Sequence, residues 1–117
     1  MEEKGKERRK YNRYASNITS LCIKRSENQN NLEMDVIPIK NMGLGGVFLQ
    51  TDIPYKTGTV IDIQFIVPEY TKPVTIRGKV VWVKVMDKTP GMGIEFISIS
   101  DKDKDALVQF FNKLKQI

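Results

Sequence analysis

Apolar and polar positions alternate along most of the chain, and this period of two predicts β-strands. The alternation is clearest at 59–67, where Ile61, Ile63, Phe65 and Val67 occupy every second position. Patterns of the same kind predict strands at 17–24, 34–40, 46–51, 59–67, 74–85 and 92–98, with proline and glycine mostly in the connections between them. Within 74–85 the alternation changes phase around Gly78, which predicts a β-bulge or a bend.

The period changes near the end of the chain. Ala106, Leu107, Phe110, Phe111 and Leu114 recur at three- and four-residue intervals, which predicts a helix over 101–116 with one apolar stripe. Ser100, followed by Asp103, is a capping pattern, and the basic residues Lys113 and Lys115 suit the last turn. The stripe needs a surface to cover, so we expect a mostly β fold: a six-stranded antiparallel barrel with one C-terminal α-helix.

Size and charge divide the chain into two parts. A length of 117 residues with 40% apolar residues supports one domain with a single core, which we place at 14–117. The net charge is +5, and the first thirteen residues contribute six Lys or Arg against three Glu. Residues 1–13 have no aliphatic residue except Met1, so we expect a basic arm that is disordered when free.

The inventory of side chains excludes several classes of protein. With no histidine and a single cysteine, Cys22, the chain has no internal disulfide, His-based triad or histidine-containing zinc site. Asp62 and Glu95 lie within predicted strands and have no candidate partner base for acid–base catalysis. We therefore expect that the protein is not an enzyme and that it binds no metal and no cofactor. There is no apolar run of membrane-spanning length and no signal peptide, which favours a cytoplasmic location. Trp82 lies in a Val-rich strand and is expected to pack in the barrel.

Two stretches suggest ligand binding. Arg9 and Arg13 are four residues apart, about 5–6 Å on a helical turn or about 13 Å in extended chain, and either spacing can present two guanidinium groups to phosphates or to a guanine edge. The stretch 41–50, NMGLGGVFLQ, has three glycines before a strand. Such bare backbone marks a turn or a close approach by another group.

The chain resembles the PilZ domains, bacterial receptors for cyclic di-GMP, over nearly its whole length. The resemblance rests on an Arg-x-x-x-Arg motif, here Arg9 to Arg13, ahead of the first strand. The second motif is Asp or Asn, any residue, Ser, any two residues, then Gly, and Asn41, Gly43 and Gly46 fall on its three fixed positions. GKVVWVK and PGMGIEF are softer features of the resemblance. At Gly43 the chain departs from the motif, because the family has Ser there.

The resemblance implies that the arginine arm folds over cyclic di-GMP on the barrel surface. Arg9 and Arg13 would contact phosphates or guanine, and Asn41 a guanine edge. Gly43 and Gly46 would permit close approach, while Arg8 and Lys10 would be accessory phosphate contacts. A lone receptor domain would relay the signal to an unidentified protein partner, as a monomer or a homodimer.

Two alternatives stay open. The loss of the Ser hydroxyl at Gly43 also fits a PilZ-type adaptor that acts by protein–protein interaction without cyclic di-GMP. A small barrel with a basic tail also suits a nucleic-acid-binding protein. The sequence disfavours that second alternative, because Trp82 and Phe65 lie among aliphatic residues and charge outside the arm is nearly balanced.

Overall fold

The computed structural model describes residues 13–25 and 31–114, with only the backbone of Arg25. Of the expected arm at 1–13, only Arg13 is among them. The described elements are β1 (Tyr14–Ala15), β2 (Thr19–Arg25), β3 (Leu32–Met42), β4 (Gly46–Gln50), β5 (Val60–Phe65), β6 (Val74–Lys84), β7 (Gly91–Ile99) and α2 (Asp101–Phe111).

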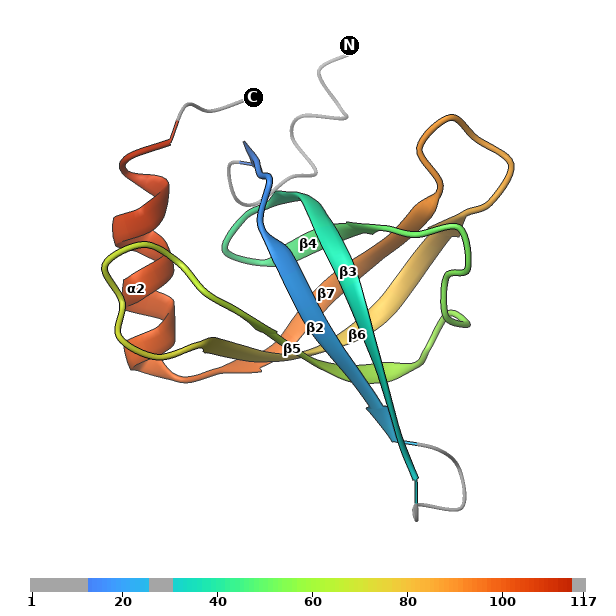
Figure 1. Cartoon of the computed structure of the whole chain (residues 1–117), viewed down its shortest axis with the longest axis horizontal. Coiled ribbons are helices and arrows are strands. Elements are labelled where there is room, and N and C mark those ends of the chain that lie inside the picture. Colours follow the sequence, from blue (N-terminus) through green and yellow to red (C-terminus); the bar gives the residue numbers. More distant parts are fainter. Residues whose placement is uncertain (1–12, 26–30, 115–117) are drawn as a thin grey trace, which may run out of the picture.

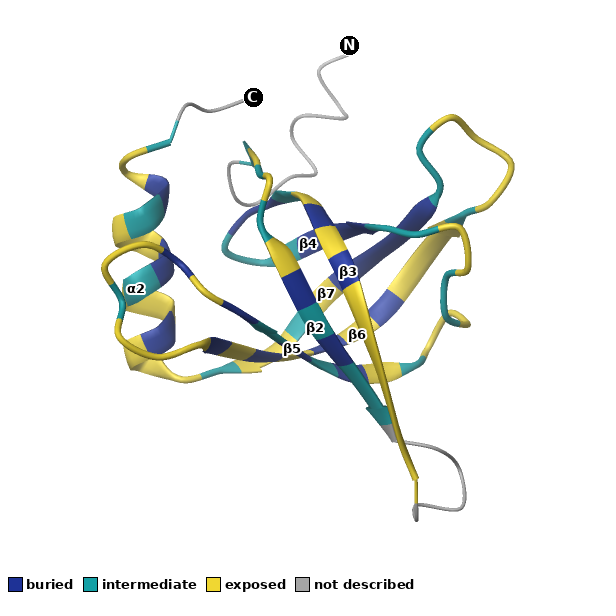
Figure 2. Ribbon diagram, in the orientation of Figure 1, coloured by how far each residue is buried: buried dark blue, intermediate teal, exposed yellow. Residues whose placement is uncertain are grey.

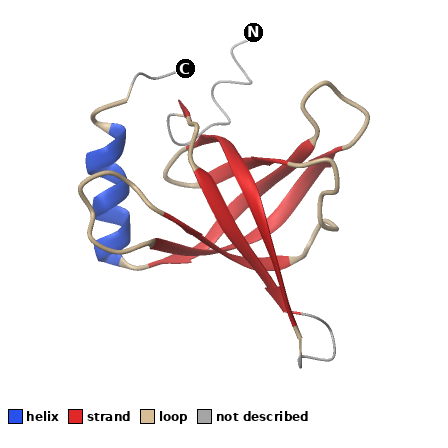
Figure 3. Ribbon diagram, in the orientation of Figure 1, coloured by secondary structure: helices blue, strands red, loops and turns tan. Residues whose placement is uncertain are grey.

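The strands form a closed barrel with the helix at one side (Figures 1 and 3). Around the barrel the order is β3, β2, β5, β6, β7 and β4, and the pairing of β4 with β3 closes it. All of these pairings are antiparallel, so the expected six-stranded antiparallel barrel is confirmed. The short β1 was not expected; it pairs with the end of β3 at Asn41 and Met42.

Buried and exposed residues follow one another along the strands (Figure 2), and the buried apolar ones form the barrel core. Ile61, Ile63, Phe65 and Val67 are all buried, which confirms the pattern in β5 and the residues that follow it. Cys22 is buried among them, and desolvation raises the pKa of its thiol to about 11. Cys22 is therefore a structural thiol and not a reactive one.

The expected irregularity in the strand at 74–85 is present. The ladder between β6 and β7 shifts register between Arg77 and Gly78, with Ile97 as the extra residue on β7. Burial nevertheless keeps its alternation through Gly78 to Val80. The change of phase comes at the second shift, where Val81 is the extra residue on β6, because a bulge in the strand itself turns the following side chains to the other face.

Helix α2 begins as predicted and ends earlier. The Ser100 side chain accepts from the Asp103 N–H at 3.1 Å, which confirms the cap. The prediction of a helix to 116 is wrong, because after Phe111 the chain tightens into i→i−3 hydrogen bonds, with 3.0 Å between Lys113 N and Phe110 O. The last helical turn has no basic residue. Lys113 instead pairs with Glu69, which lowers the pKa of that carboxyl.

A buried carboxylate ties α2 to the barrel. Asp103 is buried, and it accepts hydrogen bonds from the Tyr70 hydroxyl at 2.6 Å and the Thr75 N–H at 3.1 Å.

In the described part of the chain, no helix is long and apolar enough to cross a membrane. No group of three or more metal-ligating side chains occurs among those residues.

Candidate ligand-binding face

The strand β1 brings the two sequence motifs together. Pairing sets Ala15 opposite Asn41, and the Tyr14 ring stacks on Phe111 of α2 at 4.6 Å between ring centroids. These two attachments fix the chain next to Arg13. The Arg13 guanidinium donates to Asn41 Oδ1 from Nε at 3.2 Å and from Nη2 at 2.5 Å.

The glycine-rich stretch is a tight turn between β3 and β4. The Gly43 N–H donates to Gly46 O at 2.9 Å, and the Phe96 N–H donates to Gly45 O at 2.9 Å. A Cβ on Gly46 would lie 2.4 Å from Ile94 O, so glycine is needed there for β4 and β7 to pair. Among the described glycines only Gly58 has a positive φ, so Gly43 has a backbone that other residues can adopt.

A row of side chains crosses the outer face of the barrel beside this turn. The register places Asn41 of β3 opposite Phe48 of β4, Phe48 opposite Gly93 of β7, and Gly93 opposite Trp82 of β6. Paired residues in an antiparallel sheet share a face, so these four lie in one row about 14 Å long. Val47 and Leu49 belong to the core, and Phe48 between them points outward.

The aromatic residues of this row form a stack over bare backbone. The rings of Phe48 and Trp82 are 5.4 Å apart and nearly parallel, at 14°. A Cβ on Gly93 would lie 2.2 Å from the Trp82 indole, so only glycine leaves room for the stack. The expectation that Trp82 packs in the barrel is therefore wrong in part: its indole covers Phe48 from outside and remains 45% exposed.

The predicted site residues have different outcomes. Arg13, Asn41, Gly43 and Gly46 meet at one end of the barrel's outer face. Arg8, Arg9 and Lys10 lie outside the described residues, so their proposed contacts stay predictions.

Sequence reasoning missed the aromatic row. The information was present in GMG at 91–93, where two glycines alternate in a strand and leave bare outer surface for a neighbouring ring to cover. Lys84 extends this surface with a positive charge, since its Nζ lies 5.2 Å from the centroid of the Phe48 ring.

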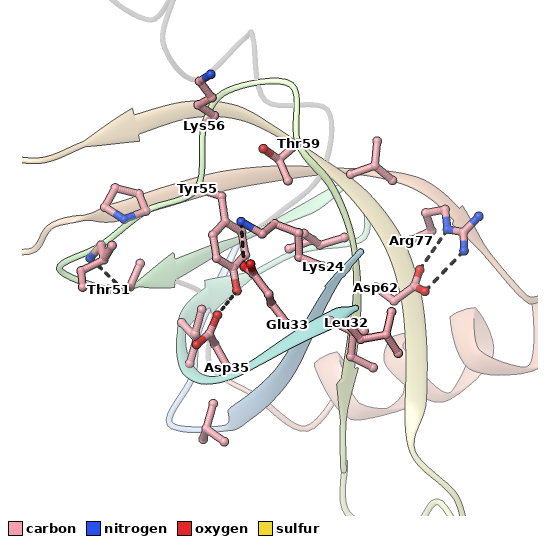
Figure 4. Close-up of a pocket in the computed structure, with 17 residues that line it drawn as sticks. Lys24, Leu32, Glu33, Asp35, Thr51, Tyr55, Lys56, Thr59, Asp62 and Arg77 are labelled. Atoms are coloured by element: carbon pink, nitrogen blue, oxygen red, sulfur yellow. Dashed lines mark hydrogen bonds and ion pairs between the residues drawn. The ribbon is translucent and has the colours of Figure 1, made fainter. Parts of the chain in front are cut away.

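The acidic residues considered for catalysis have structural surroundings. Asp62 accepts from the Arg77 guanidinium at 2.9 Å on the outer face of the barrel, and Glu95 is exposed. A separate cleft of about 1060 Å³ contains none of the predicted site residues. Figure 4 shows this cleft, with Tyr55 and Lys24 at its centre and the Asp62–Arg77 pair at its margin.

Comparison with known proteins identifies the family. Residues 7–113 match the PilZ domain family, so the chain belongs to the PilZ domains, as the sequence motifs indicated. No curated protein matches the sequence.

Solved structures with the same fold share little sequence. The structure of the Bacillus subtilis inhibitor of motility, MotI/DgrA, matches with a TM-score of 0.69 at 18% identity, over 91% of this chain and 52% of that one. The PilZ domain of Escherichia coli YcgR, solved with cyclic di-GMP, gives 0.64 at 17% identity, over 90% of both chains. The K. pneumonia MrkH complex with cyclic di-GMP gives 0.65 at 18%, over 89% of this chain. This chain spans about half of MotI/DgrA and of MrkH.

Proposed function

We propose that this protein is a cyclic di-GMP receptor that binds the dinucleotide on the outer face of the barrel, between the arginine segment and the Asn41–Trp82 row. PilZ domains are receptor or effector domains and not enzymes. Two of the similar structures were solved with this ligand. The observation that carries the proposal for this chain is the pair of hydrogen bonds between Arg13 and Asn41, which unites the two motifs.

The Arg13–Asn41 contact decides which atoms face the ligand. Asn41 Oδ1 already accepts from Arg13, so the amide Nδ2 is the part of Asn41 that can donate to a phosphate oxygen or to guanine O6 or N7. The guanidinium is held in place by the same contact, next to the glycine-rich turn, in which Leu44 has the only side chain among residues 43–46. Arg9, with Arg8 and Lys10 as accessory contacts, would complete the phosphate clamp in this proposal.

The aromatic row offers a surface for a base. A purine can stack on the exposed part of Trp82, whose indole is already supported from below by Phe48 and Gly93. The positive charge of Lys84 suits the phosphates of such a ligand. We further propose that the bound state is read by a protein partner, as suits a receptor domain of this family.

Calorimetry on the purified protein tests the proposal. We expect cyclic di-GMP to bind, and Arg13→Ala to weaken binding roughly ten- to hundredfold, since it removes charge-assisted hydrogen bonds worth about 1.5–3 kcal/mol. Arg77→Ala is the matched control, because Arg77 pairs with Asp62 away from the row. Unchanged affinity in Arg13→Ala would rule out the clamp.

The same experiment distinguishes the alternatives. Exposure of Trp82 removes one argument against nucleic-acid binding, so single-stranded RNA is titrated in parallel. Tight RNA binding without cyclic di-GMP binding would support a nucleic-acid-binding barrel. A well-folded protein that binds neither would support the adaptor.

A further inference from the structure

The β2–β3 hairpin projects beyond the rest of the barrel (Figure 1). Over Leu32–Pro38, strand β3 pairs with β2 on one side. On its other side, pairing with β4 begins only at Ile39. Along Leu32–Pro38 this second edge is therefore not covered by any strand in the described part of the chain.

Among the described residues, the backbone groups on this edge have no strand to pair with. The Ile39 N–H donates to Ile18 O at 2.8 Å, toward β2. Because hydrogen bonding alternates along an antiparallel ladder, Ile37 and Asp35 also point their backbone groups toward β2. The N–H and C=O groups of Met34 and Val36 consequently point to the open edge, and Pro38, which has no N–H, ends it.

The side chains give the edge two unlike faces. Leu32, Met34 and Val36 form an apolar outer stripe with exposures of 47%, 58% and 73%. Glu33 and Asp35 alternate with them on the opposite face. There Lys24 pairs with Glu33 at 3.0 Å, and the Tyr55 hydroxyl donates to Asp35 at 2.5 Å.

The open edge borders the cleft of about 1060 Å³ (Figure 4). The hairpin forms one wall of the cleft and the segment between β4 and β5 forms a second, while Ile61 and Asp62 of β5 and Arg77 of β6 also line it. A strand added to β3 would lie about 4.8 Å from it, inside this cleft. The residues that line the cleft from the two walls include Leu32, Glu33, Asp35 and Val36, and Thr51, Ile53, Pro54 and Tyr55.

Charge disfavours a second copy of β3 in the registers centred on the open edge. Two β3 strands can pair antiparallel about Glu33, Met34 or Asp35 and keep both apolar stripes on one face. Each of these registers places an acidic side chain opposite another acidic side chain. Like charges directly opposite each other destabilise a strand pair, so a strand with basic residues at these positions fits the edge better than a second β3.

We propose that the open edge of β3 at Leu32–Pro38 binds an extended segment of another protein, in which apolar residues alternate with Lys or Arg. The apolar residues would continue the Leu32–Met34–Val36 stripe, and the basic ones would face Glu33 and Asp35. Main-chain hydrogen bonds to Met34 and Val36 give affinity, and the two faces give specificity. The inference does not depend on cyclic di-GMP binding.

NMR titration of the full chain with synthetic peptides tests this. The probe is acetyl-KVKVKVK-amide, and its matched control is acetyl-KKKKVVV-amide, which has the same composition without alternation. We expect the probe to shift the amides of Met34 and Val36 and the control to bind at least tenfold more weakly. Equal binding of both peptides, shifts away from β3, or no binding of the probe would overturn the proposal.

Two variants separate backbone pairing from charge. Met34→Pro removes an N–H that points to the open edge, so it should fold and bind the probe at least tenfold more weakly; Met86→Pro, in an exposed loop, is its control. Glu33→Lys should weaken binding of the probe and strengthen binding of acetyl-EVEVEVE-amide. Unchanged affinity in both variants would contradict the proposal. Arg13→Ala should bind the probe like the wild type, which separates this test from that of the cyclic di-GMP site.

Discussion

Gly43 is a buried residue at the start of the β3–β4 turn, and its φ is not positive. A Ser there meets no backbone strain, and it adds a hydroxyl two residues along the chain from Asn41. We expect Gly43→Ser to leave the melting temperature nearly unchanged and to tighten cyclic di-GMP binding roughly two- to tenfold, the worth of one hydrogen bond. By contrast, Gly46→Ser should lower the melting temperature, because the added Cβ would collide with Ile94 O. A Gly43→Ser variant that binds more weakly would contradict this account.

Trp82 is the only tryptophan in the chain, so its fluorescence reports on one place. If a guanine stacks on the indole, cyclic di-GMP should change the emission. Trp82→Leu should then weaken binding roughly five- to hundredfold, because base–aromatic stacking is worth about 1–3 kcal/mol. Val85→Ala, an exposed position outside the row, serves as the control. Wild-type affinity in Trp82→Leu would remove the stacking surface from the proposed site.

The attachment of helix α2 to the barrel depends on Asp103. Asp103→Ala leaves the Thr75 N–H without its acceptor and the Tyr70 hydroxyl without its partner, so we expect a loss of about 2–4 kcal/mol in the free energy of unfolding. Asp105→Ala, two residues along and exposed, should change it by less than about 0.5 kcal/mol. Urea unfolding measures both, and equal effects would show that Asp103 acts only through its charge near the helix start.

The elements also show how far the sequence predicts this structure. Alternation located all six barrel strands and the stripe of α2, because burial of one face leaves a period that can be read directly. Strand and helix ends were less predictable, since Phe111 ends α2 through local hydrogen bonds that no periodicity reports. The outward position of Trp82 depends on the bulge at Val81, and a one-residue insertion in a ladder follows from tertiary pairing. The contact of Arg13 with Asn41 depends on β1, which is too short to leave a pattern.

For the whole molecule, the buried thiol predicts a pH dependence. The folded pKa of Cys22 is raised to about 11 from its ordinary 9.0. The resulting stabilisation is complete below pH 9 and is lost as the pH rises through 11. The difference of two units between the folded and unfolded pKa corresponds to about 2.7 kcal/mol in the free energy of unfolding. Urea unfolding between pH 8 and pH 11 should therefore show a steeper loss of stability in the wild type than in Cys22→Ala. Parallel curves for the two proteins would contradict burial of the thiol.

In the proposed function, cyclic di-GMP binds on the outer face of the barrel, at the junction of Arg13, Asn41 and the aromatic row. Heteronuclear NMR with increasing cyclic di-GMP can locate the ligand, because every amide and the one indole N–H report at once. We predict the largest shifts at Arg13, the Asn41 side-chain amide, Gly43 to Gly46 and the Trp82 indole, with little change at Tyr55 in the cleft. Shifts confined to the cleft, or a spectrum unchanged at saturating ligand, would contradict the account.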